Sequence, residues 1–175
     1  MPLLKGQTIV EDVWTRVADD QPIPADGAVI VTLERLEAEA EHLWHRPDGI
    51  GVELRPEQPV ERLEPWLARL RLVALRFPGF ADGRAFSTAR ILRTRYRYEG
   101  EVRATGNVLV DQRQFMLQCG FDSFEVAEGR ALQAWLSARV QMPLTYQVGY
   151  EEQAGHPALA VFAARHSRPE ALAAE

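Results

Sequence analysis

Cysteine is almost absent from this chain of 175 residues, because Cys119 is the only one. A single thiol cannot form an internal disulfide, a thiolate zinc site or the four-cysteine cradle of an iron–sulfur cluster. Histidine is also scarce, and His42 and His45 stand three residues apart, which fits the four-residue spacing of a helical zinc pair poorly. The sequence therefore predicts no metal site. Cys119 shares an apolar helical face with Val108 and Phe115, so we predict a buried thiol.

The short motifs that hold nucleotides are missing as well. No GxGxxG follows the first predicted strand, and neither GxxxxGKS nor GxxxxGKT occurs in the chain. The standard dinucleotide and triphosphate sites are therefore not present. A GxSxG nucleophile elbow is also lacking. No cofactor is evident from the sequence, and the catalytic residues, if there are any, are unknown.

Long apolar runs and an excess of positive charge are lacking too. The start of the chain, MPLLKGQTIVED, has neither the basic residues nor the long apolar core of a secretory signal. No run approaches the roughly 18 apolar residues of a membrane span. These features predict a cytoplasmic protein without a membrane partner. The formal net charge is -5, so we expect no nucleic-acid partner, and any anion must be bound by a local group of arginines.

Short apolar runs alternate with amphipathic stretches, and this alternation indicates an α/β protein. Strands and helices that take turns along a chain form parallel crossovers. We predict about five βα units in an open, mostly parallel sheet with helices on its faces; a partial (βα) barrel is the alternative, since a complete barrel needs about 250 residues. The predicted strands are 28–33, 49–54, 72–77, 101–105 and 121–126, and the predicted helices are 33–44, 59–70, 85–96, 108–118 and 128–140.

The same pattern divides the chain into three parts. Residues 1–27 are predicted to form an N-terminal arm, in which residues 6–12 alternate as an edge strand or hairpin arm does. Residues 28–150 are predicted to form a single α/β domain, with 145–150 as a further edge strand. The tail, 151–175, shows no clear pattern, and we expect part of it to be disordered.

Residues with special backbone or charge roles crowd into the stretch 77–125. Two of its loops follow strands that end near Phe77 and Thr105, and parallel sheets bind ligands beyond the carboxyl ends of their strands. Arg84 stands just before a helix, where guanidinium donors and free backbone N–H groups can bind an oxyanion together. The candidate residues for binding an anion or a partner are Asp82, Gly83, Arg84, Ser87, Arg90, Arg103, Gly106, Asn107 and Asp111.

These candidates also have purely structural interpretations. Asp82-Gly83 is a common turn, and Asn107 could cap the following helix. Asp111, in the first turn of that helix, could stabilise it through the helix dipole. The arginines could form a solvated helix face that pairs locally with Asp82 or Glu101. Both interpretations stay open at the level of sequence.

Three runs in this stretch, DGRAFSTARILRTR, GEVRATGNVLVDQ and CGFDSFE, resemble a bacterial domain-of-unknown-function family, number nine-three-four. Arg97 stands where that family usually has a glycine, and Asn107 stands where an acidic or other polar residue is common. Members are usually labelled as oxidoreductases of sulfite reduction. The resemblance therefore implies an accessory protein of assimilatory sulfite reduction that docks on sulfite reductase or its electron donor, since one cysteine excludes a self-contained sulfite reductase. A small enzyme with an anionic substrate is the alternative, and a homo-oligomer is compatible with either.

Overall fold

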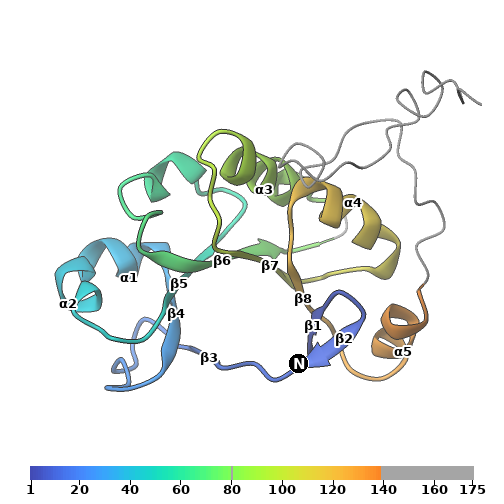
Figure 1. The fold of residues 1–175 in the computed structure, drawn as a ribbon, viewed down its shortest axis with the longest axis horizontal. Coiled ribbons are helices and arrows are strands. Elements are labelled where there is room, and N and C mark those ends of the chain that lie inside the picture. Colours follow the sequence, from blue (N-terminus) through green and yellow to red (C-terminus); the bar gives the residue numbers. More distant parts are fainter. Residues whose placement is uncertain (80, 139–175) are drawn as a thin grey trace, which may run out of the picture.

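The computed structural model describes residues 1–79 and 81–138, which form one curled sheet with helices around its outside (Figure 1). The predicted strand 145–150 and the predicted tail 151–175 lie outside the described residues. The strands are β1 (Leu3–Lys5), β2 (Thr8–Val10), β3 (Trp14–Arg16), β4 (Ala28–Thr32), β5 (Ile50–Leu54), β6 (Leu70–Phe77), β7 (Glu101–Gly106) and β8 (Ser123–Glu125). The helices are α1 (Leu33–Ala38), α2 (Ala40–Trp44), η1 (Val60–Leu63), α3 (Arg84–Thr94), η2 (Val110–Gln112), α4 (Arg113–Cys119) and α5 (Arg130–Ser137), of which η1 and η2 are 3-10 helices.

The eight strands form a single, mostly parallel sheet in the order β2-β1-β8-β7-β6-β5-β4-β3. All neighbours from β3 to β8 pair in parallel, and β1 pairs antiparallel with both β2 and β8. The sheet curls into a half-barrel, so that its two ends approach each other (Figure 1). The α/β class and the mostly parallel sheet are therefore confirmed. The first 27 residues, predicted as an arm, contribute three strands to this sheet.

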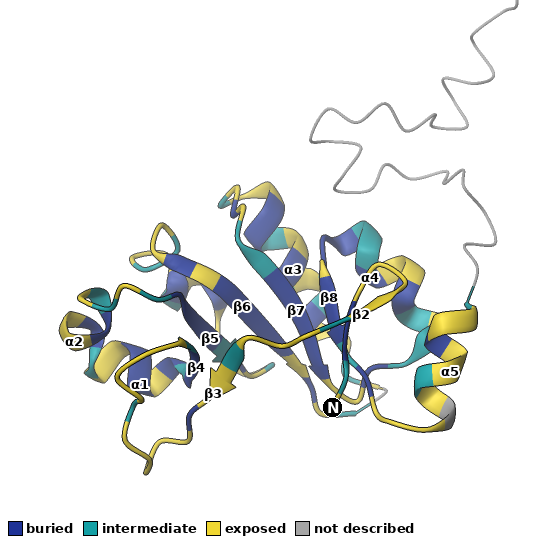
Figure 2. Ribbon diagram, turned by 60° about the horizontal axis from the view of Figure 1, so that its bottom comes forward, coloured by how far each residue is buried: buried dark blue, intermediate teal, exposed yellow. Residues whose placement is uncertain are grey.

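Each of the five strands predicted between residues 28 and 126 corresponds to an observed one, with bounds that differ by two residues or fewer. The reason is visible in β4, where the apolar run from Val29 to Val31 is fully buried. Apolar, β-branched runs of this length fit the crowded middle of a parallel sheet. The central strands β6, β7 and β8 are mostly buried, whereas β2 and β3 at the ends of the sheet are largely exposed (Figure 2).

The helices differ more from the prediction. The helix predicted at 59–70 is only the short η1, because Pro65 has no backbone N–H to continue it and Leu70 already begins β6. The helix predicted at 33–44 is divided into α1 and α2 at Glu39, whose φ of -116° and ψ of 20° are not helical. The helix predicted at 108–118 begins later, because Leu109 is extended and η2 precedes α4.

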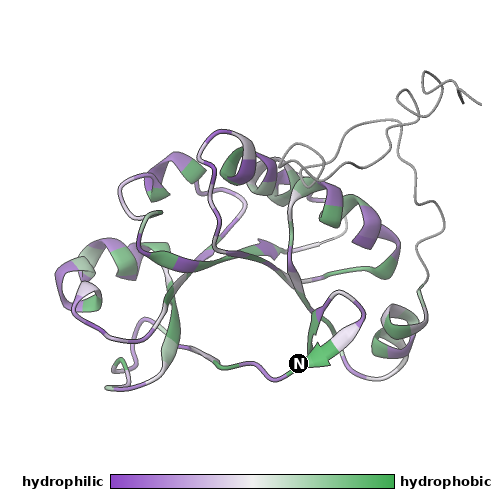
Figure 3. Cartoon of the chain, viewed as in Figure 1, coloured by the Kyte–Doolittle hydropathy of each residue, from purple (hydrophilic) through white to green (hydrophobic). Residues whose placement is uncertain are grey.

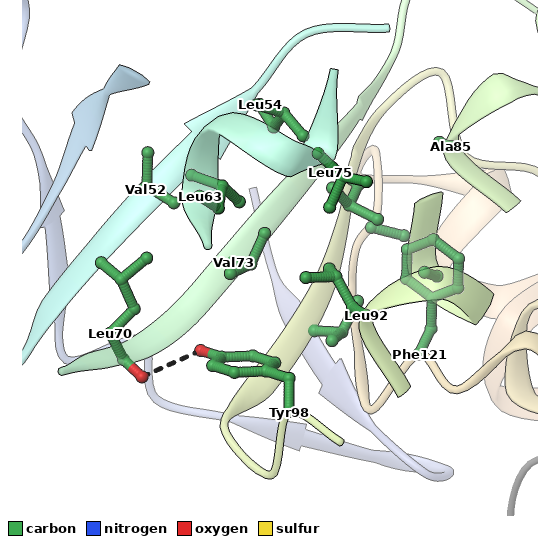
Figure 4. Close-up of a cluster of buried hydrophobic side chains, with 14 of the residues drawn as sticks. Val52, Leu54, Leu63, Leu70, Val73, Leu75, Ala85, Leu92, Tyr98 and Phe121 are labelled. Carbon is green, nitrogen blue, oxygen red and sulfur yellow. Dashed lines mark hydrogen bonds between the residues drawn. The ribbon is translucent and has the colours of Figure 1, made fainter. Parts of the chain in front are cut away.

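The main core lies between the sheet and the helices on its convex side. Val73 and Leu75 of β6 point outward into it, and Leu92 of α3 packs from the other side (Figure 4). Phe77 and Ala89 belong to the same buried cluster. The helices alternate between hydrophobic and hydrophilic residues along their length, as one buried face requires (Figure 3). We predicted helices on both faces of the sheet, but the described helices lie on the convex side and leave the concave side to the strands (Figure 1).

Candidate functional site

The concave, inner face of the sheet carries every second residue of each strand. Part of it is apolar, because Ile30, Leu72 and Ala74 pack there against Trp14. Gly49 makes room for the indole ring, since a Cβ atom at this position would lie 2.9 Å from Cη2 of Trp14. The other side chains of the inner face are mainly charged, and they gather on β7, β8 and β1 and near the carboxyl ends of β5 and β6.

Arg103 of β7 is the centre of this charged part. Its side chain is 0% exposed, and its Nη1 atom lies 2.8 Å from Asp12 and 3.4 Å from Glu125. Its Nε atom donates a hydrogen bond of 3.0 Å to Glu101. Removing a guanidinium from water costs several kcal/mol, and these carboxylates offset that cost. Burial alone would lower the pKa of Arg103, but the bonds and charges of Asp12 and Glu101 outweigh burial and raise it.

Glu101 connects Arg103 to the first strand. Its carboxylate accepts a 2.6 Å hydrogen bond from the Ser123 hydroxyl and forms a 2.6 Å ion pair with Lys5 of β1. Burial alone would raise the pKa of Glu101, but the bonds from Lys5 and Ser123 and the charge of Arg103 together lower it. Glu101 is therefore an ionised carboxylate that holds β1, β7 and β8 together.

A second group of ion pairs lies at the carboxyl ends of the strands. Arg16 at the end of β3 pairs with Glu53 of β5 and, at 2.7 Å, with Glu125 of β8, so it joins the two sides of the curled sheet. Arg76, near the end of β6, has a single ion pair among the described residues, a 3.5 Å contact with Glu53. The charged residues of the inner face, which we call the inner-face network, are Lys5, Asp12, Arg16, Glu53, Arg76, Glu101, Arg103 and Glu125.

Two donors in this region have unused hydrogen-bonding capacity among the described residues. The hydroxyl of Thr105 is buried without a partner. The Nη2 atom of Arg103 lies 3.0 Å from Glu101 but outside hydrogen-bond geometry, and it is buried as well. Buried polar groups are nearly always bonded, so two unbonded donors two residues apart on one strand indicate a place for a further acceptor.

A second buried arginine, Arg93, lies with its hydrogen-bond acceptors at the amino ends of β7 and β8. Arg93 of α3 is 3% exposed and donates to the carbonyl oxygens of Tyr98, Gly100 and Gly120 and to the carboxylate of Asp122. The Tyr98 hydroxyl donates to the carbonyl of Leu70 at the start of β6 (Figure 4). We call the set Arg93, Tyr98, Gly100, Gly120 and Asp122 the amino-edge clamp.

The predicted residues of the turn before α3 bind one another. Arg84 donates to Asp82 through Nε at 3.0 Å and through Nη2 at 2.6 Å, and its backbone N–H donates to the same carboxylate. The hydrogen bonds from Arg84 hold the pKa of Asp82 below its usual range. Gly83 is the residue before the helix. The structural interpretation of this turn therefore accounts for its contacts.

Gly106 is the last residue of β7 at the carboxyl edge of the sheet, and Asn107 follows it. Gly106 has a φ of +84°, and a Cβ atom there would lie 2.4 Å from the carbonyl oxygen of Phe77. The backbone of the neighbouring strand β6 thus approaches this glycine closely. The backbone N–H of Asn107 donates to the same carbonyl at 2.8 Å, and its exposed side chain does not cap a helix, because Leu109 precedes η2.

The remaining candidates lie on two different faces of the sheet. Ser87 and Arg90 are exposed on the outer side of α3, and Asp111 is exposed in η2. Arg103 lies on the inner face, so the structure does not bring it together with Arg84, Ser87 or Arg90. It does bring Asp82, Gly83 and Arg84 together in one turn.

Sequence reasoning missed most of the inner-face network. Its signal is the alternation within the strands, in which Glu101, Arg103 and Thr105 share one side of β7 while Val102 and Ala104 are buried on the other. Ser123 and Glu125 show the same spacing in β8. The signal for Arg93 is its position on the same helix face as the buried Ala89, four residues earlier. The burial of Cys119 is confirmed.

These features define an α/β protein with a curled, mostly parallel sheet and a charged inner face. Residues 51–156 match the family described as "Bacterial protein of unknown function (DUF934)", and the chain belongs to this family. The comparison with curated proteins gives no match. Within residues 1–79 and 81–138, no helix is long and apolar enough to cross a membrane, and no group of three or more His, Cys, Asp or Glu side chains is placed to hold a metal ion.

Proposed function

We propose that this protein is a cytoplasmic accessory protein of assimilatory sulfite reduction, which docks on sulfite reductase or on its electron donor. The pathway is supported by the resemblance of the runs around α3, β7 and β8 to a family whose members carry that label. The mode of action is supported by the outer surface of α3 and α4, which combines an exposed aromatic ring with a cation that has no ion pair to any described residue.

The observation that carries the docking proposal is a cationic surface on a chain with a net charge of -5. Between Asp82 and Glu99 the sequence contains five arginines and no acidic residue, and four of these arginines are exposed, the exception being the buried Arg93. Arg90, in the middle of α3, is exposed and forms no ion pair with any described residue. A local excess of one sign against the overall charge favours a partner surface of the opposite sign.

An apolar anchor lies beside this cation. The ring of Phe115 on α4 is 52% exposed and lies 4.9 Å from that of Phe86, one helical turn before Arg90. Arginine and aromatic side chains are enriched among the residues that contribute most to binding at protein interfaces. We call Phe86, Ser87, Arg90 and Phe115 the outer helix surface, and it suits an acidic partner with an apolar depression.

The test is a binding measurement between the purified protein and purified sulfite reductase or its electron donor. Arg90→Glu and Phe115→Ser should each weaken the complex, by about tenfold or more for a contact at the centre of an interface. Arg55→Glu reverses a charge at an exposed arginine that follows β5, pairs with Glu34 and does not belong to the outer helix surface, and it should bind as the parent does. The docking proposal fails if neither candidate partner binds the parent, or if the three variants bind alike.

A small enzyme with an anionic substrate is the second candidate, and the position of Arg103 on the inner face favours it. An enzyme with redox activity needs a cofactor, so the absorbance spectrum of the protein as purified discriminates between the two functions. Bound flavin, or nicotinamide retained through purification, would favour the enzyme. Sulfite reductase recovered together with the protein from cells grown on sulfate would favour the accessory role.

A further inference from the structure

We propose that Arg76, Thr105 and Arg103 form a binding site for a small inorganic oxyanion on the inner face of the curled sheet. The site is separate from the outer helix surface, and neither its existence nor its failure depends on the docking proposal. Its ligand would be a compact anion with several equivalent oxygen atoms, of the sulfite, sulfate or phosphate type.

The first argument is the unused donors. Thr105 is 2% exposed and its hydroxyl has no partner among the described residues. Arg103 is 0% exposed, and its Nη2 atom lies 3.0 Å from Glu101 but outside hydrogen-bond geometry. An unbonded buried polar group costs free energy, so an acceptor that reached these atoms would stabilise this part of β7.

The second argument is the position of Arg76. It is the partner of Thr105 in the pairing of β6 with β7, and it lies on the same face because Ala74 and Leu72 before it belong to the inner face. Neighbouring strands are about 4.8 Å apart, so the Arg76 side chain starts next to the Thr105 hydroxyl. Its guanidinium is 54% exposed and has only the 3.5 Å contact with Glu53. An anion could therefore take Arg76 from Glu53 at little cost.

The third argument is the local charge. Three guanidinium groups, from Arg16, Arg76 and Arg103, surround two carboxylates, from Glu53 and Glu125, at this end of the network. Arg103 is also bound to Asp12 and Glu101, so the whole network balances four cations with four carboxylates, and an incoming anion would pair with Arg76 in place of Glu53. Paired guanidinium donors and a hydroxyl match the equivalent oxygens of a small oxyanion.

The experiment is calorimetric titration of the whole protein with sulfite, sulfate and phosphate at constant ionic strength, with chloride as the reference anion. Thr105→Val keeps the shape of the side chain and removes only the hydroxyl, and Arg76→Gln removes the charge. Each should weaken binding by about tenfold, as expected for a hydrogen bond to a charged group. Arg71→Gln is the matched control, because it removes an exposed arginine from the other end of β6.

The result expected is binding of at least one oxyanion by the parent, loss in Thr105→Val and Arg76→Gln, and no change in Arg71→Gln. Thr105→Val should melt at the same temperature as the parent or higher, because it replaces an unbonded hydroxyl by a methyl group. The site is refuted if no oxyanion binds at millimolar concentration, if all three variants lose affinity equally, or if Thr105→Val melts well below the parent.

Discussion

Arg93 and Arg103 are both buried arginines, but the acceptors that bind them differ: mainly backbone carbonyl oxygens for Arg93 and only carboxylates for Arg103. Arg93 donates to three backbone carbonyl oxygens and one carboxylate, and those carbonyls belong to the turns that begin β7 and β8. Arg103 is bound to the carboxylates of Asp12, Glu101 and Glu125, which come from separate segments. One arginine fixes the backbone of its surroundings, whereas the other belongs to a set of side chains that share their charges.

The two kinds of acceptor differ in whether they can find another cation when the arginine is lost. A carbonyl oxygen cannot find another donor once its arginine is gone, so the amino-edge clamp has no substitute. A carboxylate in the inner-face network can turn to another cation, as Glu125 does with Arg16 and Glu101 with Lys5. The inner-face network can therefore rearrange to bind a ligand, whereas the amino-edge clamp stabilises the fold.

The largest expected effect is the loss of the amino-edge clamp. Arg93→Met should lower the free energy of unfolding by about 3–5 kcal/mol, because it leaves buried acceptors without donors. Arg95→Met, at a side chain that is 62% exposed, should change it by less than about 0.5 kcal/mol. Urea titration measures both. Equal losses in the two variants would show that Arg93 does not act as a clamp.

Arg103→Met should have a smaller effect, although Arg103 is the more buried of the two. We expect a loss of about 2–3 kcal/mol in the free energy of unfolding, because Lys5 and Arg16 remain to pair with the carboxylates. The same urea titration measures it. A loss as large as that of Arg93→Met would remove the distinction between the two clusters.

The third prediction concerns how the contribution of Glu101 to the free energy of unfolding depends on pH. Glu101 has a lowered pKa in the folded protein, below about 4.3 for an unfolded glutamate, so its ionised form stabilises the fold above that pH. Glu101→Gln should cost about 1–2 kcal/mol at neutral pH. That difference from the parent should shrink as the pH falls through the folded pKa of Glu101, because the parent then loses the same interactions. Glu128→Gln, at an exposed position, is the control. A difference independent of pH would contradict the assignment.

Arg84→Ala should have the smallest effect on folding, since Arg84 and Asp82 are paired at the surface within one turn. We expect no measurable change in the melting temperature. The pKa of Asp82, which Arg84 lowers, should rise toward its ordinary value, as an NMR titration of the carboxylate would show. An unchanged pKa would mean that the pair does not persist in solution.

The strands could be predicted from the sequence because each is encoded locally. The run Val29-Ile30-Val31 specifies its own strand, whereas Pro65 breaks the helix expected around it. The inner-face network could not be predicted, because its contacts join distant segments. Asp12 and Arg103 are separated by 91 positions, and no local pattern indicates that the chain crosses the inner face between β2 and β3. Arg84 and Asp82 are only two positions apart, so their pairing within one turn is encoded locally.

The pairing of β1 with β8 has a consequence for synthesis. Leu3 is aligned with Glu125, so β1 must wait for a strand that is made more than a hundred residues later. The strands β4 to β7 pair with neighbours that are close along the chain, so their contacts can form during synthesis. In contrast, β1 can pair only after β8 has been made, and Asp12, between β2 and β3, can bind only after Arg103 has been made. Until then the inner face is open to solvent, and its closure is the last step that assembles the charged network.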